Sequence, residues 1–357
     1  MPDEINAIIP RNNPRIVGHK RVAAALIGSY NSGKMPNAFL FCGSKGIGKA
    51  TLAYHFARFL LSDSFIKDDI IIDKSDPVFM QIEGGSNPNF LCLQSESGDI
   101  KVEQARKIND FLRLSASGKK HRVILIDSID QMNNNAQNAI LKLLEEPPTN
   151  CVFLLINHAS GKILPTIKSR CRPLMLSKLD INEVSSVLLN VLPDVSQSGL
   201  KNLSKLADGA PGFAVLLHEN DGVNLFETLK DAVFSASDVK KQQNLISLIS
   251  GKANEKSWEI FTIQINILMT NVIKNIAANN EPCVTEGSNL LKKNEPLIEK
   301  NLDELIKVWE KVNSLMRDTN RINLDKKAVI VGILRELHFL GRRELCEPDY
   351  KKQSGFL

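Results

Sequence analysis

The alternation of apolar and polar segments in the first half of the chain predicts strands that alternate with helices. Apolar strand patterns lie at 39–42, 90–93, 123–126, 152–156 and 172–176. The intervening segments include helical patterns, most clearly at 102–112, where apolar residues recur at i, i+3 and i+4. Near-continuous apolar strands separated by helices indicate an α/β fold: a parallel sheet with helices on both faces. Apart from the strand at 90–93, residues 62–99 are predicted to form loops.

The pattern changes after residue 178, beyond which only helices are predicted. Short helical patterns at 181–192, 198–207 and 212–218 precede longer ones at 258–272, 302–316 and 328–337, and polar segments lie at 279–287 and 342–357. These shifts divide the chain into an α/β domain at 1–178, a small helical domain at 179–221 and a larger helical domain at 222–357. A length of 357 residues agrees with two or three domains.

Composition and charge are those of an ordinary soluble globular protein, with 43% hydrophobic and 24% charged residues. The net charge of +5 permits contact with nucleic acid without indicating it. No apolar run reaches the roughly 20 residues that span a bilayer, and Met1–Glu4 does not begin a signal peptide. A cytoplasmic protein is therefore expected. The six cysteines include no closely spaced pair, so no zinc site is expected.

A glycine-rich loop follows the first predicted strand and leads into a helical pattern. Residues 43–49 read Gly-Ser-Lys-Gly-Ile-Gly-Lys, which is the spacing of a phosphate-binding loop in its usual strand–loop–helix context. The backbone N–H groups of such a loop, with Gly43, Gly46 and Gly48, surround an anion at the positive end of the helix dipole. Lys49 would place its ammonium group against the β- and γ-phosphates. The loop is therefore predicted to bind phosphate.

Two positions lack the chemistry that hydrolysis of a nucleotide needs. The residue after Lys49 ordinarily carries a hydroxyl that ligates magnesium, but here it is Ala50, and Thr51 lies about 100° further around the helix. Asp127, at the end of its strand, suits the second element of a phosphate site, a carboxylate near the magnesium. The residue after it is Ser128, which is not a base at neutral pH. Nucleotide binding is compatible with this set, and hydrolysis is not expected.

Other polar residues at the ends of the strands leave alternatives open. Asn157 either senses a γ-phosphate or simply ends its strand. Asp130 is expected to cap the next helix, and His158 is interpreted as a loop residue. Arg170, within Ser169-Arg170-Cys171, is either a surface cation or an arginine finger that reaches the γ-phosphate bound by a neighbouring subunit.

In this order, the motifs resemble those of the clamp-loader subunits of bacterial DNA polymerase III, which belong to the AAA+ class. The matching segments are 17–19, 43–51, 100–106, 124–130, 138–148, 169–171 and 323–325. The run Asn-Ala-Ile-Leu-Lys-Leu-Leu-Glu-Glu-Pro-Pro at 138–148, together with Ser-Arg-Cys at 169–171, is highly specific to that family. The resemblance is strong to about residue 178, and within the family the chain resembles the delta-prime type of subunit.

The resemblance implies an AAA+ P-loop domain, a three-helix lid and a helical collar that joins five subunits in a ring. It also implies a stator, which holds one end of the ring and does not turn over ATP itself, within a DNA-directed DNA polymerase complex. The ring loads the sliding clamp onto primed DNA during DNA replication. In this family the arginine of the Ser-Arg-Cys segment, here Arg170 with Ser169 and Cys171, completes the ATP site of an adjacent motor subunit.

The cofactor that the resemblance implies is ATP or ADP, held weakly or in a vestigial site, with no metal. Its binding residues would be Val17, Gly43, Gly46, Gly48, Lys49, Ala50, Thr51, Asp127 and Asn157. The zinc-binding cysteine cluster of the family has no counterpart in the sequence.

The implied partners are the gamma or tau motor subunits and the delta subunit of the ring, and indirectly the sliding clamp and primed DNA. Direct DNA contact would involve at most the phosphate backbone. The main alternative is a motor-type subunit that hydrolyses ATP at its own site. Ala50, Ser128 and Phe213 disfavour it, the last because motor subunits carry a nucleotide-sensing arginine at this lid position. An unrelated P-loop kinase or chaperone ATPase is disfavoured by residues 138–148 and by the helical second half.

Overall fold

The computed structural model describes residues 9–63, 70–95, 99–113, 121–158, 163–234, 238–250, 255–277, 302–322 and 324–342. The chain divides into two compact units, residues 1–215 and 216–357. The division into domains at 1–178, 179–221 and 222–357 stays a prediction. The predicted polar segment at 279–287 lies outside the described residues, and so does the predicted polar tail at 342–357 apart from its first residue.

A five-stranded sheet forms the centre of the first unit. Its strands are β1 (Ala38–Cys42), β2 (Phe90–Gln94), β3 (Arg122–Asp127), β4 (Cys151–Asn157) and β5 (Arg172–Met175), in the order β2-β3-β4-β1-β5. Every neighbouring pair is parallel. All of β4 and nearly all of β1 and β3 are buried, as expected for apolar strands covered on both faces. The predicted α/β fold with a parallel sheet is confirmed.

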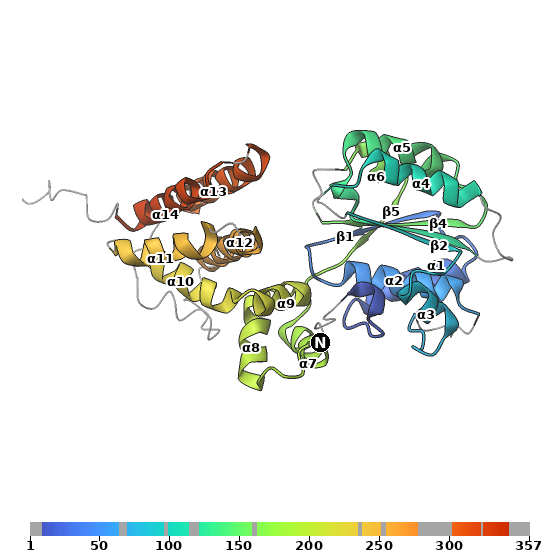
Figure 1. Ribbon diagram of the computed structural model, residues 1–357, viewed down its shortest axis with the longest axis horizontal. Helices are drawn as coiled ribbons and strands as arrows, with labels where there is room; N and C mark the ends of the chain where they lie inside the picture. The colour runs from blue at the N-terminus through green and yellow to red at the C-terminus, as the bar shows by residue number, and fades with distance from the viewer. Residues whose placement is uncertain are drawn as a thin grey trace, which may run out of the picture. The chain divides into compact units, whose positions relative to one another are not determined.

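Helices cover both faces of this sheet (Figure 1). One face carries α1 (Lys20–Asn31), α2 (Lys49–Leu61) and α3 (Pro77–Glu83), and the other carries α4 (Val102–Arg113), α5 (Asn134–Glu145) and α6 (Pro165–Lys168). Two short 3-10 helices, η1 (Pro10–Asn12) and η2 (Ile129–Gln131), complete the layers.

Helix α3 corrects the prediction of loops for 62–99. Asp76 accepts the N–H of Val78, and Pro77 occupies the first turn, where its missing N–H costs nothing. Val78, Phe79 and Ile82 are buried. The helix is seven residues long, and such a short segment carries too few apolar repeats for its periodicity to be recognised.

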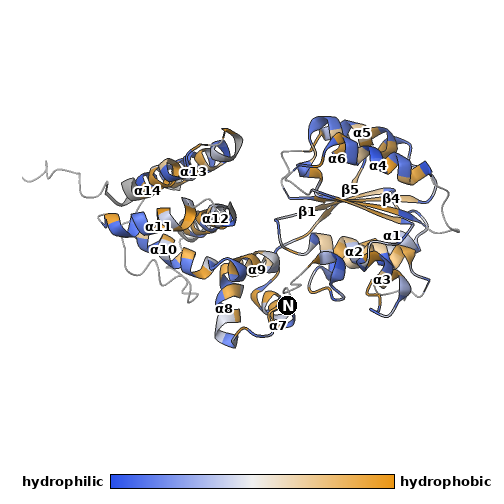
Figure 2. Ribbon diagram, in the orientation of Figure 1, coloured by the Kyte–Doolittle hydropathy of each residue, from blue (hydrophilic) through white to orange (hydrophobic). Residues whose placement is uncertain are grey.

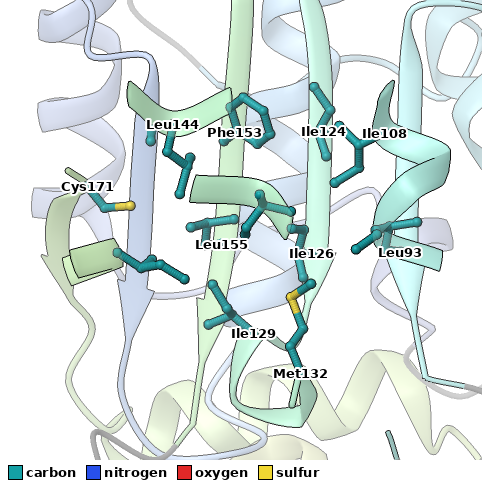
Figure 3. Close-up of a cluster of buried hydrophobic side chains, with 14 of the residues drawn as sticks. Leu93, Ile108, Ile124, Ile126, Ile129, Met132, Leu144, Phe153, Leu155 and Cys171 are labelled. Carbon is teal, nitrogen blue, oxygen red and sulfur yellow. The ribbon is translucent and has the colours of Figure 1, made fainter. Parts of the chain in front are cut away.

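A hydrophobic core fills the space between the sheet and the α4–α5 face (Figure 3). Ile124, Phe153 and Leu155 point from the strands toward Ile108 of α4 and Leu144 of α5, and all five are at most 6% exposed. Burying each such side chain contributes about 1.5–3 kcal/mol. In Figure 2 the apolar strands are enclosed by helices that turn polar residues outward, so the layers are held mainly by this burial.

Three short helices complete the described part of this region, α7 (Ile181–Val191), α8 (Gln197–Leu206) and α9 (Pro211–Glu219), which confirms the helices predicted there. Asp180 accepts the N–H groups of Asn182 and Glu183 and caps α7. Ser196 caps α8 in the same way through the N–H of Gly199. These caps satisfy N–H groups that a helix leaves unpaired at its start.

Helices make up most of the described residues of the second unit. Its helices are α10 (Gly222–Phe234), α11 (Val239–Ser250), α12 (Glu255–Ala277), α13 (Leu302–Ile322) and α14 (Lys326–Arg342). Phe261, Leu305 and Ile330 are fully buried, and the Trp309 indole donates a hydrogen bond to Asn266 across α12 and α13. Asp325 caps α14 through the N–H groups of Lys327 and Ala328. None of the described helices is long and apolar enough to cross a membrane.

Candidate functional site: the phosphate loop and Arg170

The phosphate loop joins β1 to α2 at the carboxyl edge of the sheet, where α/β proteins bind ligands. Gly43, Gly46 and Gly48 have φ values of 148°, 83° and 102°, a range that favours glycine. At Gly43 a Cβ atom would lie 2.7 Å from the Leu176 carbonyl oxygen and 2.6 Å from Ile47 Cδ1. The three glycines therefore fix the path of the loop.

Lys49 lies inside this loop and is 2% exposed. Its ammonium group donates hydrogen bonds to the carbonyl oxygens of Gly43, at 2.7 Å, and Ser44, at 2.5 Å. Burial lowers the pKa of Lys49 to about 8, while the Asp127 and Asp130 carboxylates act in the opposite direction. The ammonium group that would meet a phosphate is thus engaged by the loop's own carbonyls.

The segment before α1 also contacts the loop. His19 Nε2 lies 2.7 Å from the Ile47 carbonyl oxygen. At Gly18, where φ is 72°, a Cβ atom would lie 2.4 Å from Leu179 Cδ2. Val17 precedes Gly18 and is half-buried. The Val-Gly-His segment therefore packs between the phosphate loop and the start of the helical region after residue 178.

The first turn of α9 closes against the loop. The Gly212 N–H donates to the Gly46 carbonyl oxygen at 2.9 Å. A Cβ atom on Gly212 would lie 2.9 Å from Gly46 Cα, and one on Gly46 would lie 3.0 Å from the Phe213 nitrogen. Backbone thus packs directly on backbone at this point, and Phe213 is 6% exposed.

The acidic residues lie at the same edge of the sheet. Asp127 ends β3, and burial raises the pKa of its carboxyl group while Lys49 lowers it. Asp130 accepts the N–H of His158 at 3.0 Å, and Asn133 caps α5, so the prediction that Asp130 caps this helix is wrong. His158 follows β4 with Nε2 3.9 Å from Asp127 Oδ1, and burial lowers its pKa to about 4.

The remaining predicted residues are buried or half-buried near the loop. Asn157 is 3% exposed, and its amide donates to Cys42 Sγ at 3.9 Å across the pair β1–β4. Thr51 is 8% exposed and Ala50 half-buried in the first turn of α2, while Ser128 is 1% exposed after β3. The structure thus brings Lys49, Asp127 and Asn157 to one edge of the sheet.

These residues do not fit a magnesium-bound nucleotide in the arrangement described. The ammonium group of Lys49 is engaged by two carbonyl oxygens of the loop, and Ala50 has no hydroxyl that could ligate magnesium. Among the described residues, no three His, Cys, Asp or Glu side chains are placed to hold a metal ion.

Arg170 lies at the opposite edge of the sheet from the phosphate loop. Strand β5 pairs in parallel with β1, and Arg172 is opposite Phe39, so Arg170 precedes β5 at the amino edge. The loop begins after Cys42, at the carboxyl edge. At about 3.3 Å per residue, the stretch of β1 from Phe39 to the start of the loop at Gly43 spans roughly 13 Å.

The Arg170 side chain is held by three oxygens on its own chain. Nη1 donates to the Thr166 carbonyl oxygen at 2.8 Å and to Ser169 Oγ at 3.3 Å. Nη2 lies 2.6 Å from Glu145 Oε1, and the two side chains are 33% and 47% exposed. Cys171, next in sequence, is 6% exposed and packs in the core, which anchors the backbone at this point.

Two contacts at these sites were not predicted from the sequence. Glu145 lies in the run 138–148 that was recognised as a motif, but its pairing with Arg170 joins residues 25 positions apart. The contact of Gly212 with Gly46 likewise joins distant parts of the chain. The signal available for Gly212 was its position directly after Pro211, at a helix start where small residues allow close approach.

Comparison with known proteins supports a family for the first unit. Residues 18–180 match the family described as DNA polymerase III, delta subunit. The delta' subunit of Pseudomonas aeruginosa is 32% identical over 224 residues, which are 62% of this chain and 65% of that protein. The gamma subunit of Buchnera aphidicola is 30% identical over 215 residues, 59% of this chain and 58% of that protein.

The tau subunit of Salmonella typhimurium is also 30% identical, over 207 residues that are 56% of this chain and 32% of that protein. The chain thus spans less than two thirds of the length of each of these relatives. Relatives named gamma, tau and delta' are similar to nearly the same degree. Through residues 18–180, the chain is therefore similar to DNA polymerase III subunits that are named delta', gamma and tau.

Proposed function

We propose that the chain is a stator subunit of the delta-prime type, which does not turn over ATP and supplies Arg170 to the ATP site of a neighbouring subunit. The observation that carries the proposal is the position of Arg170 at the amino edge of the sheet, while its own phosphate loop lies at the carboxyl edge. Its guanidinium does not serve its own loop. With one third of its side chain exposed, it is accessible to a phosphate bound elsewhere.

The state of the phosphate loop supports the absence of turnover. Lys49 hydrogen-bonds the loop's own carbonyls, and Ala50 and Ser128 replace the groups that ligate magnesium and activate water. The loop is then a retained structural cradle that joins β1, α2 and α9. ATP or ADP is proposed only as a weak or vestigial ligand, bound by Val17, Gly43, Gly46, Gly48, Lys49, Ala50, Thr51, Asp127 and Asn157.

The proposed domains are an AAA+ P-loop domain at 1–178, a lid at 179–221 and a collar at 222–357. Helices α10 to α14, with their own buried core, suit a collar that joins subunits. The proposed partners are gamma or tau motor subunits and a delta subunit in a hetero-pentameric ring within the DNA polymerase complex. That ring would load a sliding clamp onto primed DNA in the cytoplasm.

The test is a loader reconstituted with Arg170→Ala and assayed for DNA-stimulated ATP hydrolysis in single-turnover conditions. Loss of an arginine finger costs about 10³-fold or more in rate at the site that it serves, so we expect a loss of that order at one site of the ring. Arg113→Ala is the control, because Arg113 is 82% exposed and pairs only with Asp110 on the same helix among its described ion pairs. An unchanged rate with Arg170→Ala would remove the proposed role.

A motor-type subunit is the second candidate, because relatives named gamma and tau match the chain as well as delta' does. The two candidates differ in what the purified chain does alone. We expect no ATP turnover above background without partners. Turnover at a rate of 1 s⁻¹ or more, on the order of ordinary enzymes, would establish the motor-type function and overturn the stator.

A further inference from the structure

We propose that Glu145 is a positioning residue for Arg170: its carboxylate sets the guanidinium in the orientation in which it meets a nucleotide phosphate of the neighbouring subunit. The role toward that phosphate rests on the proposed function. The contact between the two side chains belongs to this chain alone and is tested separately.

The guanidinium is fixed at both of its terminal nitrogens. The Thr166 carbonyl oxygen and Ser169 Oγ accept hydrogen bonds from Nη1. Glu145 Oε1 lies 2.6 Å from Nη2, which is a short, charge-assisted contact. Thr166 and Ser169 lie within four residues of Arg170 and move with it, whereas Glu145 is on a different helix. The carboxylate is thus the one contact of the three that relates the guanidinium to the body of the domain.

The backbone on both sides of the pair is anchored. Ile167 and Cys171 are 0% and 6% exposed in the core. Gln137, 1% exposed in α5, accepts the N–H of Leu164 and donates to the Met132 carbonyl oxygen. Because α5 and the segment 164–171 are locked together, the freedom that remains is in the long side chain of Arg170, and Glu145 restricts it.

The position of Glu145 in α5 needs a compensating cation. It is the last residue of the helix, where the macrodipole is negative and a carboxylate is unfavourable. Pro147 and Pro148 follow and prevent the helix from continuing past this point. The guanidinium of Arg170 supplies the opposite charge at this helix end.

The first experiment measures the contact in the full-length chain without partners. In ¹⁵N spectra of arginine side chains, restricted rotation of the Arg170 guanidinium is expected in the wild type, is lost in Glu145→Gln and is kept in Glu146→Gln. Glu146 is the matched control because it is adjacent, exposed and of the same chemistry. An Arg170 signal that stays restricted in Glu145→Gln overturns the inference.

The second experiment measures the consequence in the reconstituted loader. A partly exposed ion pair is weak, so Glu145→Gln is expected to lower ATP hydrolysis at the adjacent site by about 3- to 10-fold, far less than Arg170→Ala. Glu145→Asp, which keeps the charge, is expected to recover part of the loss, and Glu146→Gln to match the wild type. In the Arg170→Ala background, Glu145→Gln is expected to have no further effect.

The outcomes separate the two proposals. A further loss from Glu145→Gln in the absence of Arg170, or a rate equal to the wild type with Arg170 present, overturns the positioning role of Glu145. If Arg170→Ala alone has no effect on hydrolysis, the proposed function fails. The spectra of the isolated chain then still decide whether Glu145 fixes the guanidinium.

Discussion

At the scale of single residues, Lys49 illustrates how burial changes what a motif residue does. A lysine at the end of a glycine-rich loop is the usual phosphate ligand, yet here its ammonium group is enclosed by two carbonyl oxygens of the same loop. The sequence identifies the residue and its neighbours. Which groups accept hydrogen bonds from its ammonium depends on how tightly the loop closes, and the local sequence does not determine that.

Replacing Lys49 by Met removes both donors and leaves the Gly43 and Ser44 carbonyls without them. A buried polar group left unpaired costs about 1–3 kcal/mol, so we expect the free energy of unfolding to fall by that amount in urea titrations at pH 7. Lys45→Met, at an exposed position of the same loop, is expected to change it by about 0.5 kcal/mol or less. Equal midpoints for the two variants would show that the buried contacts of Lys49 do not stabilise the fold.

The same lysine gives a dependence on pH. Burial lowers the pKa of Lys49 to about 8, from its usual 10.5. Between these values the unfolded chain keeps a proton that the folded chain has lost, so the contribution of Lys49 to stability rises with pH. The difference in unfolding free energy between the wild type and Lys49→Met is therefore expected to grow from pH 8 to pH 10. A difference that stays constant or shrinks would contradict the lowered pKa.

At the scale of elements, Arg58 joins three parts of the first unit. It is fully buried in α2, donates to the carbonyl oxygens of Asn13 and Arg11 beside η1, and lies 3.8 Å over the ring of Phe79 in α3. Burial lowers the pKa of its guanidinium to about 10. A buried cation held by backbone carbonyls and an aromatic ring thus fastens the N-terminal segment to the helical layer.

Arg58→Met keeps an unbranched apolar side chain and removes the charged donors. Hydrogen bonds to charged groups contribute about 1.5–3 kcal/mol each, so for the two bonds we expect a loss of about 3–6 kcal/mol in the free energy of unfolding, measured by urea unfolding. Hydrogen exchange of residues 11–13 is expected to accelerate as well. The control is Arg106→Met on the exposed side of α4, and a loss of similar size in both variants would mean that the buried contacts are not the cause.

The contact between α9 and the phosphate loop is also a property of elements. Gly212→Ala places a Cβ atom 2.9 Å from Gly46 Cα, so the helix is expected to withdraw and the hydrogen bond to the Gly46 carbonyl to break. We expect a loss of about 1–3 kcal/mol in unfolding free energy and faster hydrogen exchange at residues 43–49.

Gly28→Ala is the control for this substitution. Nothing lies within 4 Å of a Cβ atom at Gly28, inside α1, so this change is expected to stabilise the chain by about 0.5–1 kcal/mol. If Gly212→Ala were also neutral or stabilising, the close approach of α9 to the loop would not exist in solution.

At the scale of the whole molecule, the two compact units each have a core of their own. Phe153 and Phe261 are both 0% exposed, the first in the sheet of residues 1–215 and the second in α12. Replacing either by alanine is expected to cost about 3–5 kcal/mol within its own unit. Hydrogen exchange is therefore expected to accelerate within 1–215 for Phe153→Ala and within 216–357 for Phe261→Ala. Acceleration in both units from either variant would mean that the units unfold as one.

The sequence by itself determined the class of the fold and most of its elements. Continuous apolar strands, periodic helices and the glycine loop are local patterns, and each reflects the burial or backbone conformation of the residues that carry it. The short helix α3 and the role of Asp130 were missed, because a seven-residue helix gives little periodicity and an aspartate can accept a hydrogen bond from several segments.

Only the tertiary structure decided which groups meet. It placed Arg170 at one edge of the sheet and the phosphate loop at the other, paired Arg170 with Glu145, and brought Gly212 onto Gly46. These contacts join residues far apart in sequence, and their geometry follows from strand register and helix packing, which no local pattern encodes. The sequence identifies these residues, and the register of the parallel strands determines their positions in the fold.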